Sequence, residues 1–216
     1  MSEIAPRWPK GEAVALSGPR VALDPLSLDH EEALRAVVME GDLWKIPVTV
    51  VPHPDRVRQY IESALRARDR GTDLPWVMRV IATGQVVGTR RFQFMNPKHR
   101  KLQVGSMWIA KSWQRSFVAS ETGLITLTYA FEVLRVVRVE YIFDPNNQAS
   151  RAGLEGVGVK EEGVLRNHLV MPDGRVRDSV ICSLIDREWP AAKKFLQQRQ
   201  NDRIGVLAAN APLPAG

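Results

Sequence analysis

The sequence predicts a single α+β domain with a mixed, mostly antiparallel sheet and helices on both faces. Three strand-like runs follow one another between residues 74 and 110, and a long helical run then leads to another strand-like run at residues 136–143. A helix that links neighbouring strands makes them parallel, so this order combines antiparallel and parallel pairs in one sheet. The length of 216 residues suits one medium-sized domain.

The first third of the chain is predicted to add one strand and two helices. Residues 20–25 alternate in the manner of a strand that stops at Pro25. Asp29, followed three residues later by Glu32, has the pattern of a capping box at the start of a helix. Pro54 is typical of a first helical residue, and this second helix should end before Gly71.

Turn-forming residues predict the boundaries of the remaining strands and helices. Thr83-Gly84 predicts a hairpin turn between the first two strand-like runs, and Asn96-Pro97 precedes the third. The helical run covers about residues 118–134, and a short helix follows Asp144. A closing hairpin turns at residues 172–174. The chain should end with a helix over residues 188–200.

These elements predict the domain boundaries. Residues 1–17 are expected to form an extended N-terminal arm with Trp8 as its only bulky anchor, and residues 18–200 the single domain. Residues 201–216 carry little charge and no pattern, and they are predicted to be a flexible tail.

Composition excludes several protein classes. The hydrophobic fraction of 44% and the charged fraction of 25% are those of a globular protein. The sequence has no apolar window near ~18 residues and no secretory signal pattern, and Cys182 is the only cysteine. We therefore expect a reduced, soluble, cytoplasmic protein without a membrane partner, in which Cys182 is a buried small residue. A homo-oligomer remains possible.

The net charge of +6 fits an anionic partner. Lys and Arg are dispersed among carboxylates, which favours an anionic small molecule over nucleic acid. The four histidines, His30, His53, His99 and His168, show no metal-site spacing, so no metal is predicted.

Two motifs follow predicted strands. In IAKSWQRSFVASETG, a helix starts soon after Ala110, and the free amides of its first turn together with Arg115 could hold a phosphate. In DPNNQAS, Asn147 and Ser150 lie at the start of the short helix. Each motif could also be a plain helix cap. Together they lie beyond the carboxyl ends of neighbouring strands, where open sheets bind ligands.

Three stretches carry a resemblance to a known family: LSGPRVALDPL, LQVGSMWI before WQRSFVASE, and the long segment from DPNNQAS to DREWP. From about residue 16 to residue 200 the chain resembles the GNAT-superfamily N-acetyltransferases, most closely the ribosomal-protein alanine and serine N-acetyltransferases. The resemblance implies a sheet splayed between its fourth and fifth strands. It also implies acetyl-CoA as the acetyl donor and a primary amine as the acceptor.

The resemblance also implies the donor site. The pantetheine arm should contact exposed strand backbone, and the pyrophosphate should lie on the loop and helix start. Phe117 stands where the superfamily has a glycine. Asn147 should bond the pantetheine arm, and Ser150 should protonate the departing thiolate. The residues expected to contact the donor are Trp108, Ile109, Ala110, Gln114, Arg115, Ser116, Phe117, Val118, Ala119, Ser120, Asn147 and Ser150.

The acceptor site and the general base are less defined. Trp44 and Gln103 are predicted to line the acceptor cleft, although Trp44 fits core packing equally well. Relatives often have Glu where this chain has Gln103, and a neutral amide is no base. His168 is therefore a candidate catalytic base, with Glu140 as another. The alternative functions are a non-catalytic acyl-CoA-binding or regulatory protein and, from charge alone, a nucleic-acid-binding module.

Overall fold

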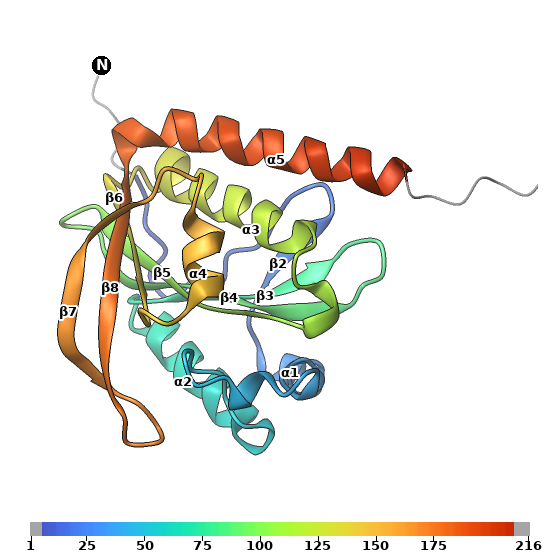
Figure 1. Cartoon of the computed structure of the whole chain (residues 1–216), viewed down its shortest axis with the longest axis vertical. Coiled ribbons are helices and arrows are strands. Elements are labelled where there is room, and N and C mark those ends of the chain that lie inside the picture. Colours follow the sequence, from blue (N-terminus) through green and yellow to red (C-terminus); the bar gives the residue numbers. More distant parts are fainter. Residues whose placement is uncertain (1–5, 210–216) are drawn as a thin grey trace, which may run out of the picture.

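The computed structural model describes the backbone of residues 6–209 and the side chains of residues 6–200. It has three layers (Figure 1). Helices α3 (Phe117–Thr128) and α5 (Trp189–Ala209) cover one face of a sheet, and helices α1 (Glu31–Met39) and α2 (Val57–Asp69) cover the other. The short helix α4 (Gln148–Leu154) follows the sixth strand.

The sheet has eight strands in the order β1-β2-β3-β4-β5-β6-β8-β7. All neighbours pair antiparallel except β5 and β6, which are parallel and are linked by α3. The strands are β1 (Leu16–Ser17), β2 (Val21–Pro25), β3 (Leu74–Val80), β4 (Val86–Asn96), β5 (Lys101–Ile109), β6 (Arg138–Phe143), β7 (Lys160–Val170) and β8 (Val176–Ile185).

Two hydrophobic clusters hold the layers together. The larger joins the sheet to α3 and α5, with Trp76, Phe92 and Leu127 among its buried members. The smaller joins the opposite face to α1 and α2 through residues such as Leu34 and Ile61. Successive side chains along a strand therefore pack alternately into the larger and the smaller cluster, and the position of a residue in its strand determines which face of the sheet its side chain occupies.

The predicted α+β fold is confirmed, including the parallel pair after the antiparallel strands and helices on both faces. Three details differ from the sequence prediction. The capping box lies one turn earlier, at the 3-10 turn Leu28–His30 that leads into α1, and it uses Ser27 and His30 instead of Asp29 and Glu32, with His30 Nδ1 accepting from the Ser27 N–H at 3.1 Å. Helix α3 ends in a π-helical turn, Tyr129–Val133.

The third difference is the end of the chain. Helix α5 continues through Ala209, nine residues beyond its predicted end, so residues 201–209 are helical where a flexible tail was expected. Residues 1–5 of the predicted arm and 210–216 of the predicted tail lie outside the described residues. Trp8 is buried in the larger cluster, as an anchor should be. Within the described part of the chain, no helix is both long enough and apolar enough to span a membrane.

Candidate active site

The parallel strands β5 and β6 pair only at their beginnings. Lys101, Leu102 and Gln103 face Arg138, Val139 and Glu140, and the pairing stops there. Both strands then continue without pairing to each other, β5 to Ile109 and β6 to Phe143. The sheet is therefore splayed at this point, and the backbone of β5 beyond Gln103 lacks its neighbour on one side. We call this opening the β5–β6 gap.

A bulge in β5 shapes the wall of the gap. Thr89 of β4 faces Trp108 and Arg91 faces Gly105, so β5 has one more residue than β4 over this stretch. Ser106 has a left-handed φ of 47°, and its carbonyl accepts a hydrogen bond from Thr89 Oγ1 at 2.9 Å. Met107 is 41% exposed as a result of this turn, beside the gap.

The backbone hydrogen bonds of the last β5 residues show which amide faces the gap. The Ala110 N–H donates to the Val87 carbonyl of β4 at 2.8 Å, so it is engaged on the side away from the gap. Amides alternate in direction along a strand, so the N–H of Ile109 points toward the gap. Among the three predicted backbone contacts, Ile109 is the residue whose amide is positioned to meet a ligand.

The loop after β5 is held by side-chain hydrogen bonds to its own backbone. Gln114 Nε2 donates to the Ile109 carbonyl at 3.1 Å. Arg115 has a left-handed φ of 61° and is exposed. Ser116 caps α3, because its Oγ accepts from the Val118 N–H at 3.2 Å and donates to the Trp113 carbonyl at 2.7 Å. Ser116 therefore caps α3, and the Val118 amide is already used by the cap, while phosphate binding at this helix start stays a prediction.

Helix α3 is also anchored to strand β2 by a buried carboxylate. Glu121 is fully buried and accepts from the backbone N–H of Arg20 at 2.6 Å, from Arg20 Nε at 2.7 Å and from the Val21 N–H at 2.9 Å. The Arg20 guanidinium lies 4.3 Å above the ring of Phe117, at the first turn of α3. Ser120 Oγ donates to the Phe117 carbonyl at 3.0 Å. The start of α3 is thus rigidly placed relative to the sheet.

A second buried carboxylate organises the start of α4. Asp144 directly follows β6 and is fully buried. Its Oδ1 accepts from the Asn146 N–H at 2.9 Å, and its Oδ2 accepts from Arg175 Nη2 at 2.8 Å. Burial acts to raise the pKa of Asp144, but the Asn146 hydrogen bond and the charges of Arg175 and Arg177 outweigh it and lower this pKa. Asp144 is therefore ionised at neutral pH.

The next turn presents the Asn-x-x-Ser pair of the motif. Asn147 Oδ1 accepts from the Ser150 N–H at 2.9 Å, so Asn147 caps α4 as predicted. Because β5 and β6 are parallel, their carboxyl ends lie at the same edge of the sheet. The start of α3 and the start of α4 are therefore placed at the same end of the gap.

Arg175 links this turn to the loop between α1 and α2. Its Nη2 also donates to the Pro47 carbonyl at 2.9 Å. Its ionic partner is Asp144, at 2.8 Å. Trp44, in the same loop, is half-buried and contacts His53 edge-on with ring centroids 4.5 Å apart. Trp44 also packs against the smaller cluster, as the core-packing interpretation predicts, and its place at the acceptor cleft stays a prediction.

His168 lies on β7, hydrogen-bonded to buried Ser179. Arg177 donates to Ser179 Oγ from Nε at 3.1 Å and from Nη2 at 2.9 Å. With both lone pairs of this hydroxyl engaged, its hydrogen is directed at His168 Nδ1, 3.0 Å away. In neutral His168 the other ring nitrogen, Nε2, then carries the hydrogen, so Nε2 is a donor and has no free lone pair.

Gln103 and Glu140 sit side by side where the gap opens. Glu140 Oε1 accepts from Arg138 Nε at 2.8 Å and from Lys101 Nζ at 3.1 Å. Burial acts to raise the pKa of Glu140, but Arg138 and Lys101 outweigh it and lower this pKa. A carboxylate with a lowered pKa binds protons weakly, so this geometry does not favour Glu140 as a base.

The strand register places the residues predicted for the acceptor side on the face of the sheet that carries α2. On this face Gln103 pairs with Glu140, and Glu140 pairs with Ser183. Ser179 lies further along the same face of β8 and contacts His168. Trp108 lies on the same face, with its ring 5.8 Å from Tyr60 of α2. The structure therefore brings Gln103, Trp108 and His168 to the α2 face, and the starts of α3 and α4 to one edge.

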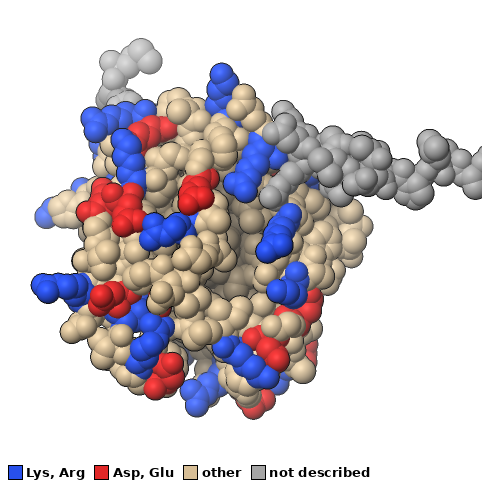
Figure 2. Space-filling view, viewed as in Figure 1, with Lys and Arg blue, Asp and Glu red and all other residues tan. Residues whose placement is uncertain are grey.

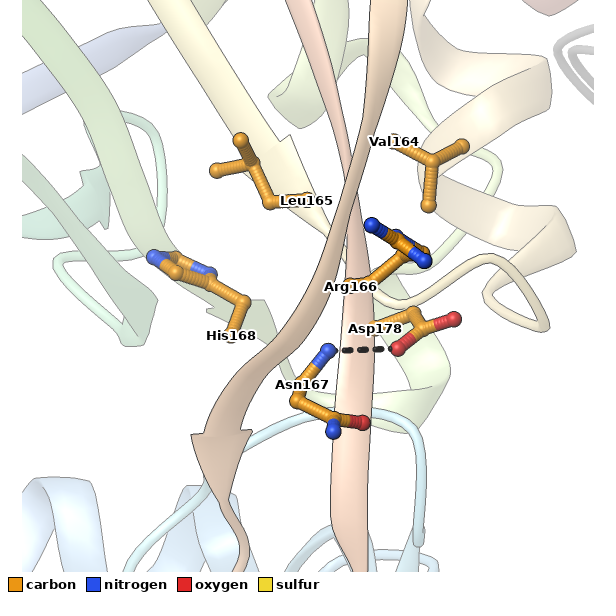
Figure 3. Close-up of a pocket in the computed structure, with 6 residues that line it drawn as sticks. All are labelled: Val164, Leu165, Arg166, Asn167, His168 and Asp178. Carbon is orange, nitrogen blue, oxygen red and sulfur yellow. Dashed lines mark hydrogen bonds between the residues drawn. The ribbon is translucent and has the colours of Figure 1, made fainter.

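A surface hollow of about 880 Å³ runs along the edge strand β7 (Figure 3). Strand β7 bulges here, with a left-handed φ of 50° at Asn167, whose N–H donates to Asp178 Oδ1 at 2.7 Å. The bulge sends His168 and Leu165 to one side of the strand and Arg166 to the other. No residue that lines this hollow belongs to β5, α3 or α4, so it is distinct from the gap.

Several features of the gap suit an acyl-CoA. At the buried Gly123 of α3, the helix that follows the gap strand β5, an added Cβ would meet no atom within 4 Å. Trp108 Nε1 is buried without a hydrogen-bond partner. Figure 2 shows a hollow near the middle of the molecule, between α3 and α4, with Lys and Arg along one rim. In the part of the chain that the structure describes, no three His, Cys, Asp or Glu side chains form a metal-type cluster.

The sequence did not predict three interactions: those of Arg90 with Met107, of Glu121 with Arg20, and of Arg175 with Pro47. Glu121 lies within the predicted helix and Arg90 within a predicted strand, and neither has a local pattern that marks it. Cys182 is buried as predicted, and burial raises the pKa of its thiol, which makes it unreactive.

Comparisons with known proteins agree with this geometry. The family model described as "Acetyltransferase (GNAT) domain" matches residues 20–160. A Bacillus subtilis protein named as a ribosomal N-acetyltransferase, YdaF, is 31% identical over 140 residues, which cover 65% of this chain and 70% of the relative. An N-acetyltransferase from Bacillus licheniformis, p20, is 29% identical over 172 residues, 79% of this chain and 95% of the relative.

Solved structures share the fold. A GCN5-related N-acetyltransferase from Brucella melitensis has 27% identity and a TM-score of 0.77, with 92% of this chain and 90% of that chain covered. Mycobacterium smegmatis RimJ, solved in complex with CoA-disulfide, has a TM-score of 0.73 at 23% identity, with 91% and 98% covered. The second likeness shows the fold alone. With the family model matched over most of its length, the chain belongs to the GNAT acetyltransferase family, and it is an N-acetyltransferase.

Proposed function

We propose that this enzyme transfers the acetyl group of acetyl-CoA to a primary amine by direct attack on the thioester, with a protein N-terminus as the favoured acceptor. The observation that carries the proposal is the β5–β6 gap. Its wall is strand backbone without a neighbour, and the starts of α3 and α4 lie at its end. Such an opening accommodates an extended, amide-containing arm that completes the hydrogen bonding of the strand.

On the donor side, Ile109 provides the backbone amide that faces the gap, between Trp108 and Ala110. The α3 start, from Gln114 to Ser120, receives the phosphates, and exposed Arg115 adds a cation there. The ring of Phe117 replaces the superfamily glycine without removing any backbone amide. Asn147 contacts the pantetheine arm from the opposite side.

Ser150 protonates the departing thiolate in this scheme. Asn147 holds the backbone of Ser150 at the first turn of α4, and Asp144 fixes the turn before it. A proton is needed on the sulfur only as the C–S bond breaks, so Ser150 acts on the rate of transfer and not on donor affinity.

On the acceptor side, Trp44, Gln103 and His168 border the path to the gap along the α2 face. His168 offers an Nε2 hydrogen to the acceptor, because its Nδ1 is taken by Ser179. The scheme therefore has no strong base. An α-amine with a pKa near 8 needs less help than a lysine at ~10.4, since each unit is worth about 1.36 kcal/mol.

The test is acetylation of a peptide that has a free N-terminus and one internal lysine. Fragment mass spectrometry of the product should place the acetyl group on the N-terminus first. A peptide with a blocked N-terminus is the control and should react much more slowly. Acetylation mainly at lysine would contradict the α-amine preference and would point to a strong base.

A non-catalytic acyl-CoA-binding protein is the second candidate, and Phe117 and Gln103 are the residues that favour it, because both replace common superfamily residues. Measuring free thiol release beside acetyl-CoA binding separates the two functions. Tight binding with no thiol release above the uncatalysed rate, across N-terminal peptides and small amines, would support the non-catalytic function.

A further inference from the structure

Arg90 is a buried arginine of β4, the strand that pairs with β5 beside the β5–β6 gap. It lies on β4 opposite Trp76, on the face covered by α3. Its Nη1 donates to Met107 Sδ of the β5 bulge at 3.0 Å. It also interacts electrostatically with buried Tyr141 of β6. Tyr141 is only one residue beyond the last β5–β6 pair, so Arg90 contacts the β5 side of the splay and acts electrostatically on the β6 side where the strands part.

Among the side chains that the structure describes, Arg90 has no anionic partner. Arg90 is only 5% exposed, its Nε is buried without a hydrogen-bond partner, and no ion pair among the described residues includes it. Its neighbour Arg91 points to the opposite face, where Asp73 lies 3.4 Å away. Buried charges are normally paired, because removing a charge from water is costly. Burial accordingly lowers the pKa of Arg90.

The reaction of the proposed function creates a negative charge in this gap. The amine nitrogen forms a bond to the thioester carbon, and the carbon–oxygen electron pair moves onto the oxygen. When that pair returns, the C–S bond breaks and the thiolate leaves. The nitrogen loses one proton and the sulfur gains one, so no oxidant or further reactant is needed. Between these steps the former carbonyl oxygen carries a full negative charge.

We propose that Arg90 is a catalytic residue whose guanidinium stabilises this oxyanion from the α3 side of the gap. The inference rests on the proposed function and adds a residue to it. A preorganised cation in a site shielded from water favours the charged intermediate over the neutral thioester. Arg90 therefore acts mainly on kcat, and its contribution to acetyl-CoA affinity is small.

The test compares Arg90→Met, which keeps the length of the side chain and removes its charge, with Arg90→Lys. Removal of one oxyanion donor lowers kcat by about 100- to 1000-fold. We expect a loss of that size for Arg90→Met, and about tenfold for Arg90→Lys, which keeps a cation in a different geometry. The Kd of acetyl-CoA, measured by calorimetry, should stay within about threefold for both variants.

Arg79→Met is the matched control. Arg79 lies on β3, outside the gap, and pairs with Asp24 at 2.5 Å. The same chemical change there should leave kcat unchanged. Circular dichroism and the midpoint of thermal unfolding verify that each variant is folded. Where Arg90→Met does not fold, Arg90→Lys carries the test by itself.

The outcomes separate the inference from the function on which it rests. A folded Arg90 variant with wild-type kcat overturns the role of Arg90 alone. A variant whose defect is entirely in the Kd of acetyl-CoA also overturns it, because the residue would then hold the ground-state donor. A wild-type protein that binds acetyl-CoA without turnover overturns both proposals.

Discussion

Two arginines on the α3 side of the sheet, Arg20 and Arg90, differ in what they contact. At the base of α3, Arg20 meets the fully buried carboxylate of Glu121, which accepts three hydrogen bonds. Arg90, on β4 beside β5, is more enclosed than Arg20, and it meets the thioether of Met107 and the electrostatic influence of the Tyr141 phenol. Glu121 supplies the negative charge for Arg20, and this pair stabilises the fold. No described carboxylate does so for Arg90, and in the proposal above the oxyanion of the reaction is its partner.

The largest expected effect is on stability, at the paired site. Glu121→Gln removes the buried negative charge and leaves Arg20 without its partner, which should lower the free energy of unfolding by about 3 kcal/mol. Denaturant unfolding measures this loss. The control is Glu12→Gln, because Glu12 pairs with Arg7 at the surface and should change stability by less than about 1 kcal/mol. Equal effects of the two changes would contradict the anchoring role of Glu121.

The next effect is on catalysis, at the start of α4. Ser150→Ala should lower kcat by at least about 100-fold while the Kd of acetyl-CoA stays nearly unchanged, because the proton is needed only in the transition state. Ser63→Ala, at an exposed position of α2, is the matched control. A Ser150→Ala variant with full kcat would reduce Ser150 to a residue of the α4 cap.

The third effect depends on pH and concerns the second buried carboxylate. The pKa of Asp144 is lowered in the folded protein, so its contribution to stability is present above the unfolded-state value of ~3.9 and is lost as the pH falls through the folded-state value. Asp144→Asn should therefore cost about 2 kcal/mol at pH 7, and the difference between wild type and variant should shrink as the pH falls below about 4 and disappear only below the folded-state pKa. Unfolding curves across this range measure the difference. A constant difference down to pH 3 would mean that the charge of Asp144 is not what matters.

The smallest effect is expected at the exposed arginine of the α3 start. Saturating acetyl-CoA at a hundredfold excess over Kd stabilises a protein by about 2.7 kcal/mol. Arg115→Ala should weaken acetyl-CoA binding by about threefold to tenfold, since a solvated phosphate contact is modest. The thermal shift at a fixed acetyl-CoA concentration should therefore be smaller than that of wild type. An unchanged shift would place the phosphates away from Arg115.

The sequence alone predicted the secondary-structure elements and their order, and it placed both candidate motifs directly after strands. Strand alternation, helix periodicity and the turn residues are local signals, and the motifs around Gln114 and Asn147 lie directly after strands. The order of elements also implied the parallel pair. Each of these features depends on neighbours within a few residues, which is why the chain reveals them without a structure.

The sequence did not reveal which polar groups meet. Arg175 bonds Pro47, 128 residues away, and Glu121 bonds Arg20, 101 residues away. That Arg90 has no carboxylate beside it among the described residues likewise depends on how the interior packs. The bulge at Ser106 sets which β5 amides point toward the gap, and it results from the register between β4 and β5. Such features depend on packing, and no local pattern encodes them.

Hydrogen–deuterium exchange with and without acetyl-CoA tests the central claim most directly, namely that the donor occupies the β5–β6 gap. We predict slower exchange on binding for backbone amides of residues 106–110 and 116–120 and at the start of α4. Strands β2 and β3 should remain unchanged, because they lie away from the gap. Protection confined to other regions, such as the hollow along β7, or no protection at saturating acetyl-CoA, would contradict the account.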